Sequence, residues 1–248
     1  MARILLTMPA WNEALIIEKN LRTLHDACSR LLVGHDWIIE VADNGSTDST
    51  PSIVKTLTFE LPRVRLLEVN GRGKGMAIRA SWAAHQADAD ILIFLDADLA
   101  ADIEALPRLV GPVLSGRADL ACGSRFMRGA EVERGWFRTL LSKGFRWWQK
   151  ILLHLPVEDS QCGFKAASSG LVNTVLPHLK EDAFLLDAEL IAQAHARGFT
   201  VVEVPVAWVE NRDQTRKSTV RLWHDIWQFL GGLLRIRRRM PKQEKNNA

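Results

Sequence analysis

Residues 91–98 read ILIFLDAD, an unbroken apolar run that ends in two acids, Asp96 and Asp98. A short apolar run of this kind is typical of a strand that is buried on both faces of a sheet. If the chain stays extended, alternation places both carboxylates on the same side of it. The stretch therefore predicts a central strand with a pair of acidic side chains where the strand ends.

The remaining sequence repeats this arrangement, with short apolar runs between longer helical patterns. The expected strands are Arg3–Met8, Trp37–Ala42, Val64–Val69, Ile91–Leu95, Leu120–Cys122 and Thr200–Trp208. The expected helices are Ala14–Leu32, Ser49–Thr58, Met76–Gln86, Ile103–Leu114 and Asp187–Ala196. This alternation favours an α/β fold with a doubly wound, mostly parallel sheet. Such a sheet binds its ligands beyond the carboxyl ends of its strands.

Composition narrows the class of protein. Of the 248 residues, 47% are hydrophobic and 25% are charged, as in an ordinary globular protein. The net charge of +3 gives no reason to expect a nucleic-acid partner. Cys28, Cys122 and Cys162 form no CxxC pair, so we expect reduced thiols in a cytoplasmic protein. No stretch approaches the roughly 20 apolar residues of a spanning helix, and the first apolar run is too short for a signal peptide.

The acidic pair Asp96 and Asp98 carries the strongest chemical signal. Two carboxylates at a strand end can hold Mg²⁺ or Mn²⁺ against a diphosphate, because these cations prefer oxygen ligands and share them with phosphates. A metal held there would neutralise charge on a departing nucleoside diphosphate. The alternative is a strand-end turn with two solvated acids, because this spacing is common by chance.

Polar motifs also follow the first two strands. In the stretch VADNGSTDST, residues 41–50, Asp43 is positioned to accept hydrogen bonds from a uracil or guanine edge. The alternative is a turn with Asp48 or Ser49 as a helix N-cap, and both interpretations can hold together. In PAWNE, residues 9–13, Trp11 could stack on a base and Glu13 could bind the ribose or base. That stretch alone favours a plain strand-to-helix turn, since Pro and Asn are common in turns.

Three later motifs are less distinctive. The stretch NGRGKG, residues 70–75, fails the phosphate-loop pattern because Gly75 stands where Ser or Thr is needed, so we expect a flexible loop at a helix start with Lys74 near phosphate. Arg125, after the fifth expected strand, suits bidentate phosphate binding. By composition alone, residues 159–165 and 184–189 are interpreted as loops and helix starts.

Together these motifs resemble the family 2 glycosyltransferases of the A-type fold, and within them the polyprenyl- and dolichyl-phosphate hexose synthases. The resemblance covers about Ile4 to Asp225. Each motif is weak alone, but eight of them in the expected order make coincidence improbable. They are Pro9…Asn12-Glu13, Asp43–Thr50, Gly73–Gly75, Asp96–Leu99, Gly123–Arg125, Asp159–Lys165, Asp187–Glu189 and Lys217-Ser218.

The resemblance implies a role for each matching position. The nucleoside pocket would be lined by Pro9, Trp11, Glu13, Val41 and Asp43. The metal, Mg²⁺ or Mn²⁺, would be held by Asp96, Asp98 and Gln161, with Ala97 beside the nucleotide. Arg125 would bind the acceptor phosphate, and Lys217, with Arg212, would close over the donor diphosphate. Asp98, Arg125 and Gln161 are the residues on which catalysis is expected to depend.

The implied activity is transfer of a hexose, with inversion, from a nucleotide sugar to a polyprenyl or dolichyl phosphate. Residues 161–165 are closest to the dolichyl-phosphate glucose synthase type, which favours UDP-glucose, but GDP-mannose stays open. One alternative is a soluble family 2 enzyme with a non-lipid acceptor. Another is a non-catalytic protein that binds nucleotide sugars, against which the intact acidic pair, Gln161 and Arg125 argue.

Two amphipathic segments indicate where in the cell the protein is expected to lie. Gly135–Leu155 and Leu222–Arg239 combine Trp, Leu and basic residues on helices too short to span a bilayer. We expect both to lie in the membrane interface, on the cytoplasmic face. A core helix with a basic face and a dimer interface are the alternatives, so an oligomer or a membrane-anchored partner stays open. The expected division is a catalytic domain 1–215 that includes helix 135–155, a basic amphipathic segment 216–240 and a disordered tail 241–248.

Overall fold

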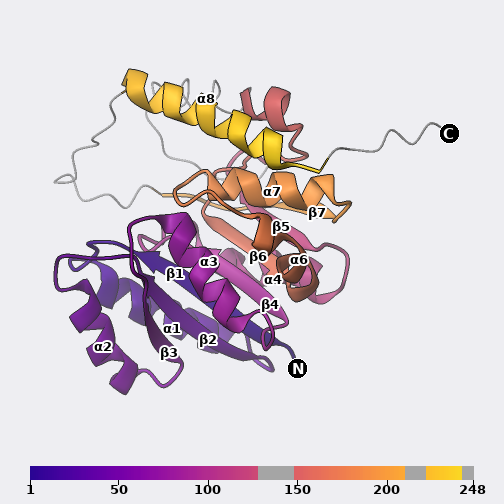
Figure 1. Cartoon of the computed structure of the whole chain (residues 1–248). Coiled ribbons are helices and arrows are strands. Elements are labelled where there is room, and N and C mark those ends of the chain that lie inside the picture. Colours follow the sequence, from indigo (N-terminus) through magenta and orange to yellow (C-terminus); the bar gives the residue numbers. More distant parts are fainter. Residues whose placement is uncertain (128–147, 210–221, 242–248) are drawn as a thin grey trace.

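The computed structural model describes residues 1–127, 148–209 and 222–241, with side chains after residue 221 described only from Phe229 onward (Figure 1). Within these ranges the strands form one seven-stranded sheet in the order β3-β2-β1-β4-β6-β5-β7. The strands are β1 Arg3–Ala10, β2 Asp36–Asp43, β3 Val64–Glu68, β4 Ile91–Leu95, β5 Leu120–Ser124, β6 Phe164–Ser168 and β7 Val201–Pro205.

The helices alternate with these strands along most of the chain. They are α1 Ile17–Leu31, α2 Thr50–Glu60, α3 Lys74–His85, α4 Leu106–Leu114, α6 Ser169–Val175, α7 Leu186–Ala196 and α8 Leu222–Arg239, with short 3₁₀ turns at Ile103–Ala105 and Leu176–His178. Residues 148–153 are helical too. The expected α/β alternation is therefore confirmed wherever the expected elements lie within the described ranges.

One strand departs from the sequence analysis. Residues 159–165 were interpreted as loops and helix starts, but residues 164 and 165 begin β6, which lies antiparallel between β4 and β5. The interpretation was wrong because Lys165 interrupts the apolar pattern, yet its side chain is fully buried. Its ammonium group lies 2.5 Å from an Asp187 carboxylate oxygen, and this distant partner makes burial of the charge tolerable. The other neighbouring strands pair in parallel.

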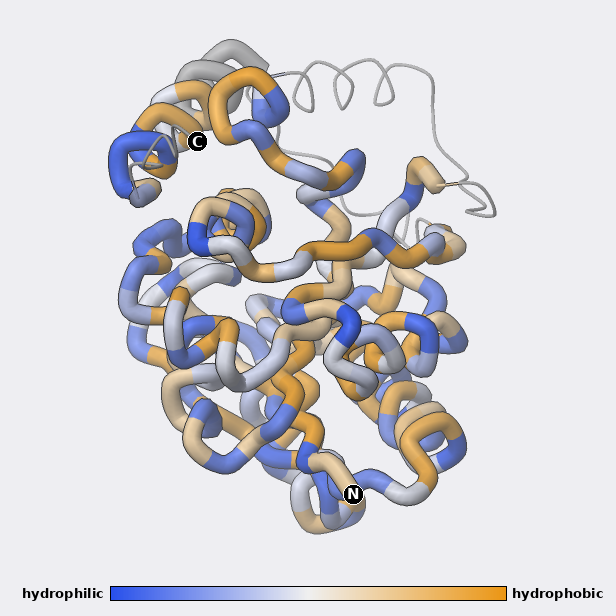
Figure 2. Tube along the Cα trace, turned by 90° about the vertical axis from the view of Figure 1, so that its right-hand side faces the viewer, coloured by the Kyte–Doolittle hydropathy of each residue, from blue (hydrophilic) through white to orange (hydrophobic). Residues whose placement is uncertain are grey.

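Two apolar layers enclose the sheet. On one face, β1 contributes Ile4, Leu6 and Met8 to a cluster that includes buried residues of α1, α2 and α4. On the other face, Leu5 joins a cluster with residues of α3, α6, α7 and α8. In this cluster the rings of Trp82 and Phe94 pack together, with their centroids 5.8 Å apart. Figure 2 shows apolar strands in the interior and helices that alternate in hydropathy around them. The strands thus contribute apolar side chains to both faces, and polar residues such as Asp43, Asn44 and Asp96 lie where strands β2 and β4 end.

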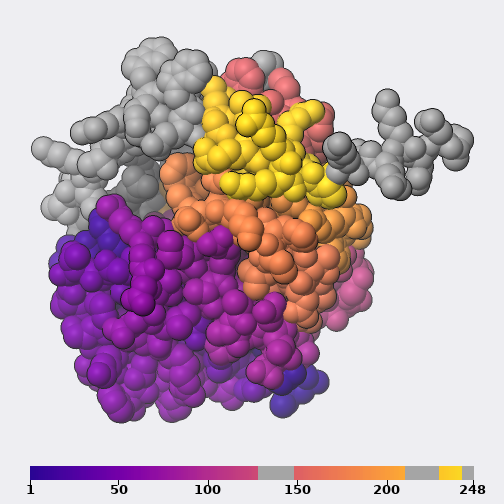
Figure 3. Space-filling view, in the orientation of Figure 1, coloured from indigo at the N-terminus to yellow at the C-terminus, as the bar shows by residue number. Residues whose placement is uncertain are grey.

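Helix α8 lies against the rest of the protein over α7 (Figures 1 and 3). Phe229, Leu233 and Ile236 are buried in the same cluster as residues of α7. Arg235 and Arg239 form ion pairs with Glu181. The predicted boundary between residues 215 and 216 lies outside the described residues, as does the predicted tail after residue 241, so the division into domains stays a prediction.

In the described parts of the chain, no helix combines the length and the apolar character that crossing a bilayer would require.

Candidate active site

The carboxyl ends of three neighbouring strands bring the sequence motifs to one edge of the sheet. In the parallel register, Ala10 at the end of β1 pairs with Asp43 at the end of β2. Thr7 of β1 pairs with Phe94 of β4, so the loop that begins at Asp96 leaves from the same edge. The predicted donor-binding and metal-binding motifs therefore lie together, as expected for a parallel sheet.

Side-chain hydrogen bonds join the loops after β1 and β2 into one unit. Asn12 takes the left-handed conformation, with φ of 54°, which asparagine adopts more readily than most residues. Its Oδ1 accepts a hydrogen bond from the Thr47 amide at 2.8 Å, and its own amide donates to Ser46 Oγ at 2.9 Å. The Glu13 amide donates to Thr50 Oγ1 at 2.8 Å. These bonds fix Trp11 and Glu13 relative to Asp43.

Ser49 is the N-cap residue of α2 but makes no side-chain capping hydrogen bond, and the first turn is bonded instead by the preceding residue, Asp48. Its carboxylate accepts hydrogen bonds from the Thr50 amide at 2.9 Å and the Ala14 amide at 3.1 Å. Hydrogen bonds from Thr50 and Ala14 lower the pKa of Asp48, although burial opposes this as the largest single influence. Of the two predicted caps, Ser49 thus occupies the N-cap position and Asp48 binds the first amide of α2, whereas the ligand-binding interpretation of Asp43 stays a prediction.

Asp43 is buried, and one of its carboxylate oxygens has no hydrogen-bond partner among the described residues. Only 4% of the residue is exposed, and its Oδ2 accepts a hydrogen bond from the Ser46 amide at 3.1 Å. Its Oδ1, and Oδ1 of the neighbouring Asn44, are buried without a hydrogen-bond partner among the described residues. An unsatisfied buried acceptor is costly, so two of them at a strand end indicate a place where a ligand donates hydrogen bonds.

The other residues predicted to line the nucleoside pocket differ in how much of their side chains can contact a ligand. The Trp11 ring lies 3.6 Å from the guanidinium carbon of Arg72, a cation–π contact that covers one ring face. Sequence reasoning did not single out Arg72, whose only signal was its place in the glycine-rich stretch. Pro9 is buried in β1. Val41 is fully buried in the core cluster, so its side chain presents no exposed surface to a ligand.

The acidic pair lies in a tight turn after β4. The chain does not stay extended after Leu95, because the Leu99 amide donates to the carbonyl oxygen of Asp96 and Leu99 has a φ of 49°. The alternation argument for Asp96 and Asp98 therefore does not apply. Instead the turn positions them: Asp98 Oδ1 accepts a hydrogen bond from the Ala100 amide at 3.1 Å. Ala97 is buried, and its carbonyl oxygen accepts from Asn20 Nδ2 at 2.8 Å.

Residues 161–163 approach this turn from the neighbouring strand. The Asp96 amide donates to the Gly163 carbonyl oxygen at 3.1 Å. A Cβ atom on Gly163 would lie 2.0 Å from Asp96 Oδ2, so any larger residue would displace this carboxylate. Gln161 brings its amide nitrogen to a buried position without a hydrogen-bond partner among the described residues. The structure thus brings the Gln161 loop to the acidic pair, as the resemblance implies.

The donor set fits the expected cation. Within the described ranges, no group of three or more His, Cys, Asp or Glu side chains could hold a metal by itself. Mg²⁺ is commonly bound by one or two carboxylates, with substrate phosphates and water supplying the remaining oxygens. Asp96 and Asp98 match that incomplete oxygen set, whereas a structural zinc site would need a full set of protein ligands.

A cluster of four charged side chains lies behind the acidic turn. Lys74 Nζ lies 2.7 Å from Asp96 Oδ1 and 3.3 Å from Asp187 Oδ2. Lys165 Nζ lies 2.5 Å from Asp187 Oδ1. Burial opposes the charge of each lysine, but the neighbouring carboxylates, Asp187 foremost, outweigh it and raise the pKa of both lysines. Both ammonium groups are therefore firmly charged at neutral pH.

Arg125 is held by a second ion pair. Its Nε and Nη2 donate to the two Asp159 carboxylate oxygens at 2.6 and 2.8 Å, and its amide donates to Asp159 Oδ2. Burial opposes the charges, but the pair outweighs it, so the pKa of Arg125 is raised and that of Asp159 is lowered. Glu203 of β7 accepts from the Asp159 amide at 2.9 Å. Of the five guanidinium N–H groups, the pair with Asp159 uses two, one on Nε and one on Nη2.

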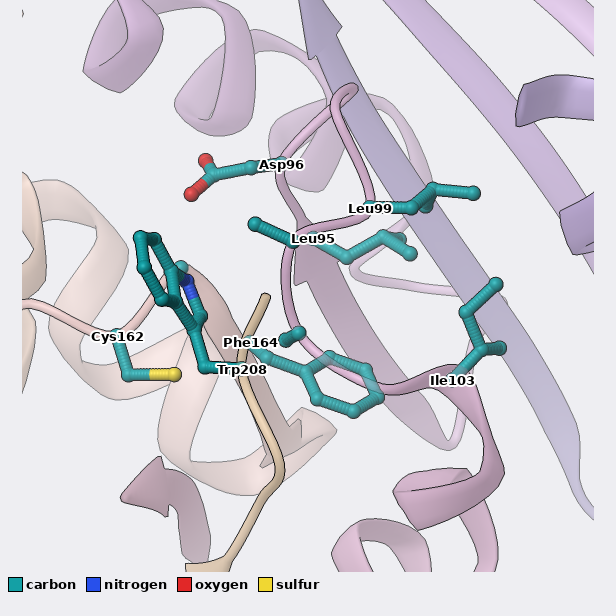
Figure 4. Close-up of a pocket in the computed structure, with 10 residues that line it drawn as sticks. Leu95, Asp96, Leu99, Ile103, Cys162, Phe164 and Trp208 are labelled. Carbon is teal, nitrogen blue, oxygen red and sulfur yellow. The ribbon is translucent and has the colours of Figure 1, made fainter. Parts of the chain in front are cut away.

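A pocket opens between the acidic turn and β6. Its lining comprises Leu95, Asp96, Leu99, Ala100, Ala101, Ile103, Cys162, Gly163, Phe164 and Trp208. Figure 4 shows Asp96 and Trp208 on one side of this pocket and the apolar side chains of Leu99, Ile103 and Phe164 on the other. Cys162 is buried, and burial raises the pKa of its thiol to about 12. The thiol is protonated at neutral pH and does not act as a nucleophile.

Some of the predicted site cannot be placed. Arg212 and Lys217 lie outside the described residues.

The expected free thiols are confirmed, since Cys28, Cys122 and Cys162 are all free and buried. Asp159 and Asp187, which composition alone left within loops and helix starts, prove to be the partners that hold Arg125, Lys165 and Lys74.

Comparison with known proteins identifies relatives over most of the chain. Glycosyltransferase AglD of Haloferax volcanii is 33% identical over 215 residues, which cover 86% of this chain and 34% of that protein. Dolichyl-phosphate beta-glucosyltransferase ALG5C of Trichomonas vaginalis is 31% identical over 188 residues, 73% of this chain and 55% of that one. The chain thus spans about a third and about half of these two relatives.

Polyprenol monophosphomannose synthase of Mycolicibacterium smegmatis is matched over more of its length. It is 30% identical over 214 residues, which cover 84% of this chain and 78% of the synthase.

The fold is similar to that of a crystal structure of glucosyl-3-phosphoglycerate synthase from Mycobacterium tuberculosis in complex with Mn²⁺, UDP and phosphoglyceric acid. The TM-score is 0.68 at 24% identity, over 98% of this chain and 80% of that one. The model of glycosyl transferase family 2 matches residues 6–168. A match of this extent, on an A-type sheet with these motifs at its carboxyl edge, shows that the chain belongs to glycosyl transferase family 2.

Proposed function

We propose that this protein moves a hexose, with inversion, from UDP-glucose or GDP-mannose to a polyprenyl or dolichyl phosphate at a membrane surface. The observation that carries the proposal is the polar edge of the sheet. There, the unsatisfied Asp43 Oδ1 and the acidic turn 96–98 follow strands that belong to one parallel register. A nucleoside diphosphate offers hydrogen-bond donors on its base, which Asp43 would accept. It also carries negative charge on its diphosphate, which a cation held by the acidic turn would neutralise.

The donor is proposed to bind along this edge from β2 to β4. Asp43 would accept hydrogen bonds from the base, and Trp11 and Glu13 would contact the base or ribose. Asp96, Asp98 and Gln161 would hold Mg²⁺ or Mn²⁺. When bound, that cation supplies charge neutralisation for the leaving nucleoside diphosphate. Lys217 and Arg212 keep their proposed place over the diphosphate.

The acceptor is proposed to approach from the β5 side. A phosphate monoester is anionic near neutral pH, so it needs positioning and charge shielding more than a strong base. Arg125 is fixed by Asp159 and has a guanidinium carbon 5.7 Å from the Trp208 ring, next to the pocket that Asp96 lines. The chain's own residues would thus orient the acceptor phosphate for a single in-line displacement. The names of the relatives, which include a polyprenol monophosphomannose synthase, support a lipid phosphate.

The experiment is a donor screen with mass spectrometry. UDP-glucose and GDP-mannose are each incubated with Mn²⁺ or Mg²⁺ and a short polyprenyl phosphate, and in parallel with 3-phosphoglycerate. A hexosyl polyprenyl phosphate is the expected product. Product from 3-phosphoglycerate alone would replace the proposal with a soluble family 2 enzyme. Nucleotide binding without transfer or hydrolysis would identify a binding protein.

Membrane contact is proposed for the side of the molecule that carries α8. The last turn of α8 holds Arg237, Arg238 and Arg239, and basic residues near an anionic leaflet gain about 1 kcal/mol each. Exposed Trp148 and Ile151 lie on the helical segment 148–153, whose Leu152 carbonyl accepts a hydrogen bond from Arg237. This union of aromatic, aliphatic and basic side chains suits an interface.

Vesicle sedimentation tests this part separately. The protein should sediment with phosphatidylglycerol vesicles at low salt, and Arg238→Glu should weaken that binding. Arg108→Glu makes the same change of charge on α4, which covers the opposite face of the sheet, and should have little effect. Full recovery in the supernatant at low salt would reject the membrane proposal.

A further inference from the structure

The backbone around Lys74 is tightly packed. The Gly75 amide donates to the Asp182 carbonyl oxygen at 2.8 Å. A Cβ atom on Gly73 would lie 2.2 Å from that same oxygen, and one on Gly75 would lie 2.4 Å from the Glu181 carbonyl oxygen. This close approach leaves little room for the flexible loop that the glycines suggested. Any adjustment near Lys74 must therefore come from its side chain, which is long and has several rotatable bonds.

The Lys74 ammonium group has two carboxylates within reach. One is Asp96, a proposed metal ligand, at 2.7 Å, and the other is Asp187 at 3.3 Å. Asp187 is fixed from its other side by the buried Lys165. The exposed fraction of the Asp96 side chain is 44%, whereas that of Asp187 is 2%. The ammonium group thus lies between an accessible acid and a buried one that cannot move away.

A divalent cation on Asp96 would have to share this carboxylate with Lys74. The four side chains Lys74, Lys165, Asp96 and Asp187 carry no net charge together, and Asp98 adds one negative charge, so a divalent cation added alone leaves one uncompensated positive charge. A metal–oxygen distance of roughly 2.1 Å leaves the two cations only a few ångströms apart on one carboxylate. Their repulsion is appreciable in a partly buried site.

We infer that Lys74 competes with the divalent cation for Asp96, and that the donor diphosphate relieves this competition by drawing the ammonium group onto itself. The inference rests on the proposed function, because it takes Asp96 as a metal ligand and a nucleoside diphosphate as the ligand next to it. Metal alone is then bound weakly, and metal with donor is bound strongly. By thermodynamic linkage, the metal strengthens nucleotide binding by the same factor.

The test measures metal binding rather than transfer. Mn²⁺ affinity is determined by calorimetry without nucleotide for the wild type and for Lys74→Met, Lys74→Arg and Lys55→Met. Lys55 is an exposed lysine on α2 and serves as the matched control. Lys74→Met is expected to bind Mn²⁺ about tenfold more tightly than the control, whereas Lys74→Arg, which keeps the charge, should bind like the wild type. UDP and GDP affinities, measured with and without saturating Mn²⁺, should show a coupling factor that falls about tenfold in Lys74→Met.

The outcomes separate the inference from the proposed function. Equal or weaker Mn²⁺ binding by Lys74→Met than by Lys55→Met would overturn the inference alone, as would a Lys74→Arg variant that behaves like Lys74→Met. Absence of Mn²⁺ binding by Lys55→Met even with UDP or GDP present would overturn the proposed metal site, and the inference with it.

Discussion

The sheet has a first half, β3-β2-β1, and a second half, β6-β5-β7, with β4 between them. The two halves differ in how their buried polar side chains are paired. At the ends of β1 and β2, Asp43 and Asn44 keep buried oxygens that no described residue satisfies. In β6 and just after β5, the buried Lys165 and the partly buried Arg125 form ion pairs with the buried carboxylates of Asp187 and Asp159. The first half leaves buried acceptor oxygens for a ligand. In the second half the charged side chains hold one another, whereas neutral groups such as Gln161 Nε2 and Ser124 Oγ are left without a partner among the described residues.

This difference predicts different costs for substitutions in the two halves. Removing an oxygen reserved for a ligand should weaken binding and leave folding nearly unchanged. Removing one partner of a buried ion pair should destabilise the fold, because the other charge is left buried and uncompensated. The turn 96–98 lies between the halves, and substitutions there should affect chemistry most.

The largest effect is expected for Asp98→Ala. Loss of a proposed metal ligand removes charge neutralisation at the leaving group, which we expect to lower the transfer rate by about 10³-fold. The free energy of unfolding should change little, because Asp98 is only partly buried and lies in a turn rather than in the core. Initial rates by mass spectrometry and urea unfolding give the two readouts. Asp26→Ala, at an exposed acid on α1, is the control, and a similar loss of rate in both variants would contradict the role of Asp98.

Next comes Lys165→Met, which breaks the buried pair beside β6. Methionine fills the space of the lysine stem but leaves Asp187 with Lys74 as its remaining cation. We expect the free energy of unfolding in urea to fall by about 3–5 kcal/mol. Lys55→Met should stay within about 0.5 kcal/mol of the wild type, as surface substitutions usually do. A Lys165→Met protein as stable as this control would show that the second half of the sheet does not depend on its ion pairs.

Asp43→Asn tests the first half. The substitution removes an acceptor and a charge where a base is proposed to donate hydrogen bonds, so nucleotide affinity should fall about 10- to 100-fold, or roughly 1.4–2.8 kcal/mol. Stability should change by less than about 1 kcal/mol, because Oδ1 has no partner within the described chain to lose. Calorimetry with UDP and with GDP measures the binding. A loss of stability as large as that of Lys165→Met would remove the distinction between the two halves.

The same contrast explains what the sequence could predict. Strands β1 to β4 follow local patterns, each an apolar run ended by a polar motif, so the strands themselves and the edge that collects Asp43 and Asp96 were predictable. Strand β6 was not, because the burial of Lys165 depends on Asp187, 22 residues further along the chain. Local pattern carries no information about such a partner.

Distance along the chain also limited the prediction of the site. Arg125 was expected to be available for phosphate, yet the structure ties it to Asp159, 34 residues away. The Asp96–Asp98 spacing suggested an extended chain, whereas a turn with Leu99 in the left-handed conformation places the two acids. Residue identities were recognisable from their motifs, but their pairing required the fold.

The smallest effect concerns the pH dependence of the Arg125–Asp159 pair. The pKa of Asp159 in the folded protein lies below its ordinary value, because the hydrogen bond and charge of Arg125 outweigh the opposing effect of burial. The stabilisation is therefore fully present above the unfolded pKa of about 3.9 and is lost as the pH falls through the lower, folded pKa.

Urea unfolding between pH 6 and pH 3 measures this loss. Below about pH 4 the wild type should lose stability more steeply than Asp159→Asn, by at most about 1.4 kcal/mol per pH unit, the limit for one proton. Asp26→Asn removes an exposed carboxylate and should keep the wild-type slope. Equal slopes for wild type and Asp159→Asn would mean that Arg125 does not hold this carboxylate ionised. The second half of the sheet would then owe its rigidity to packing rather than to charge.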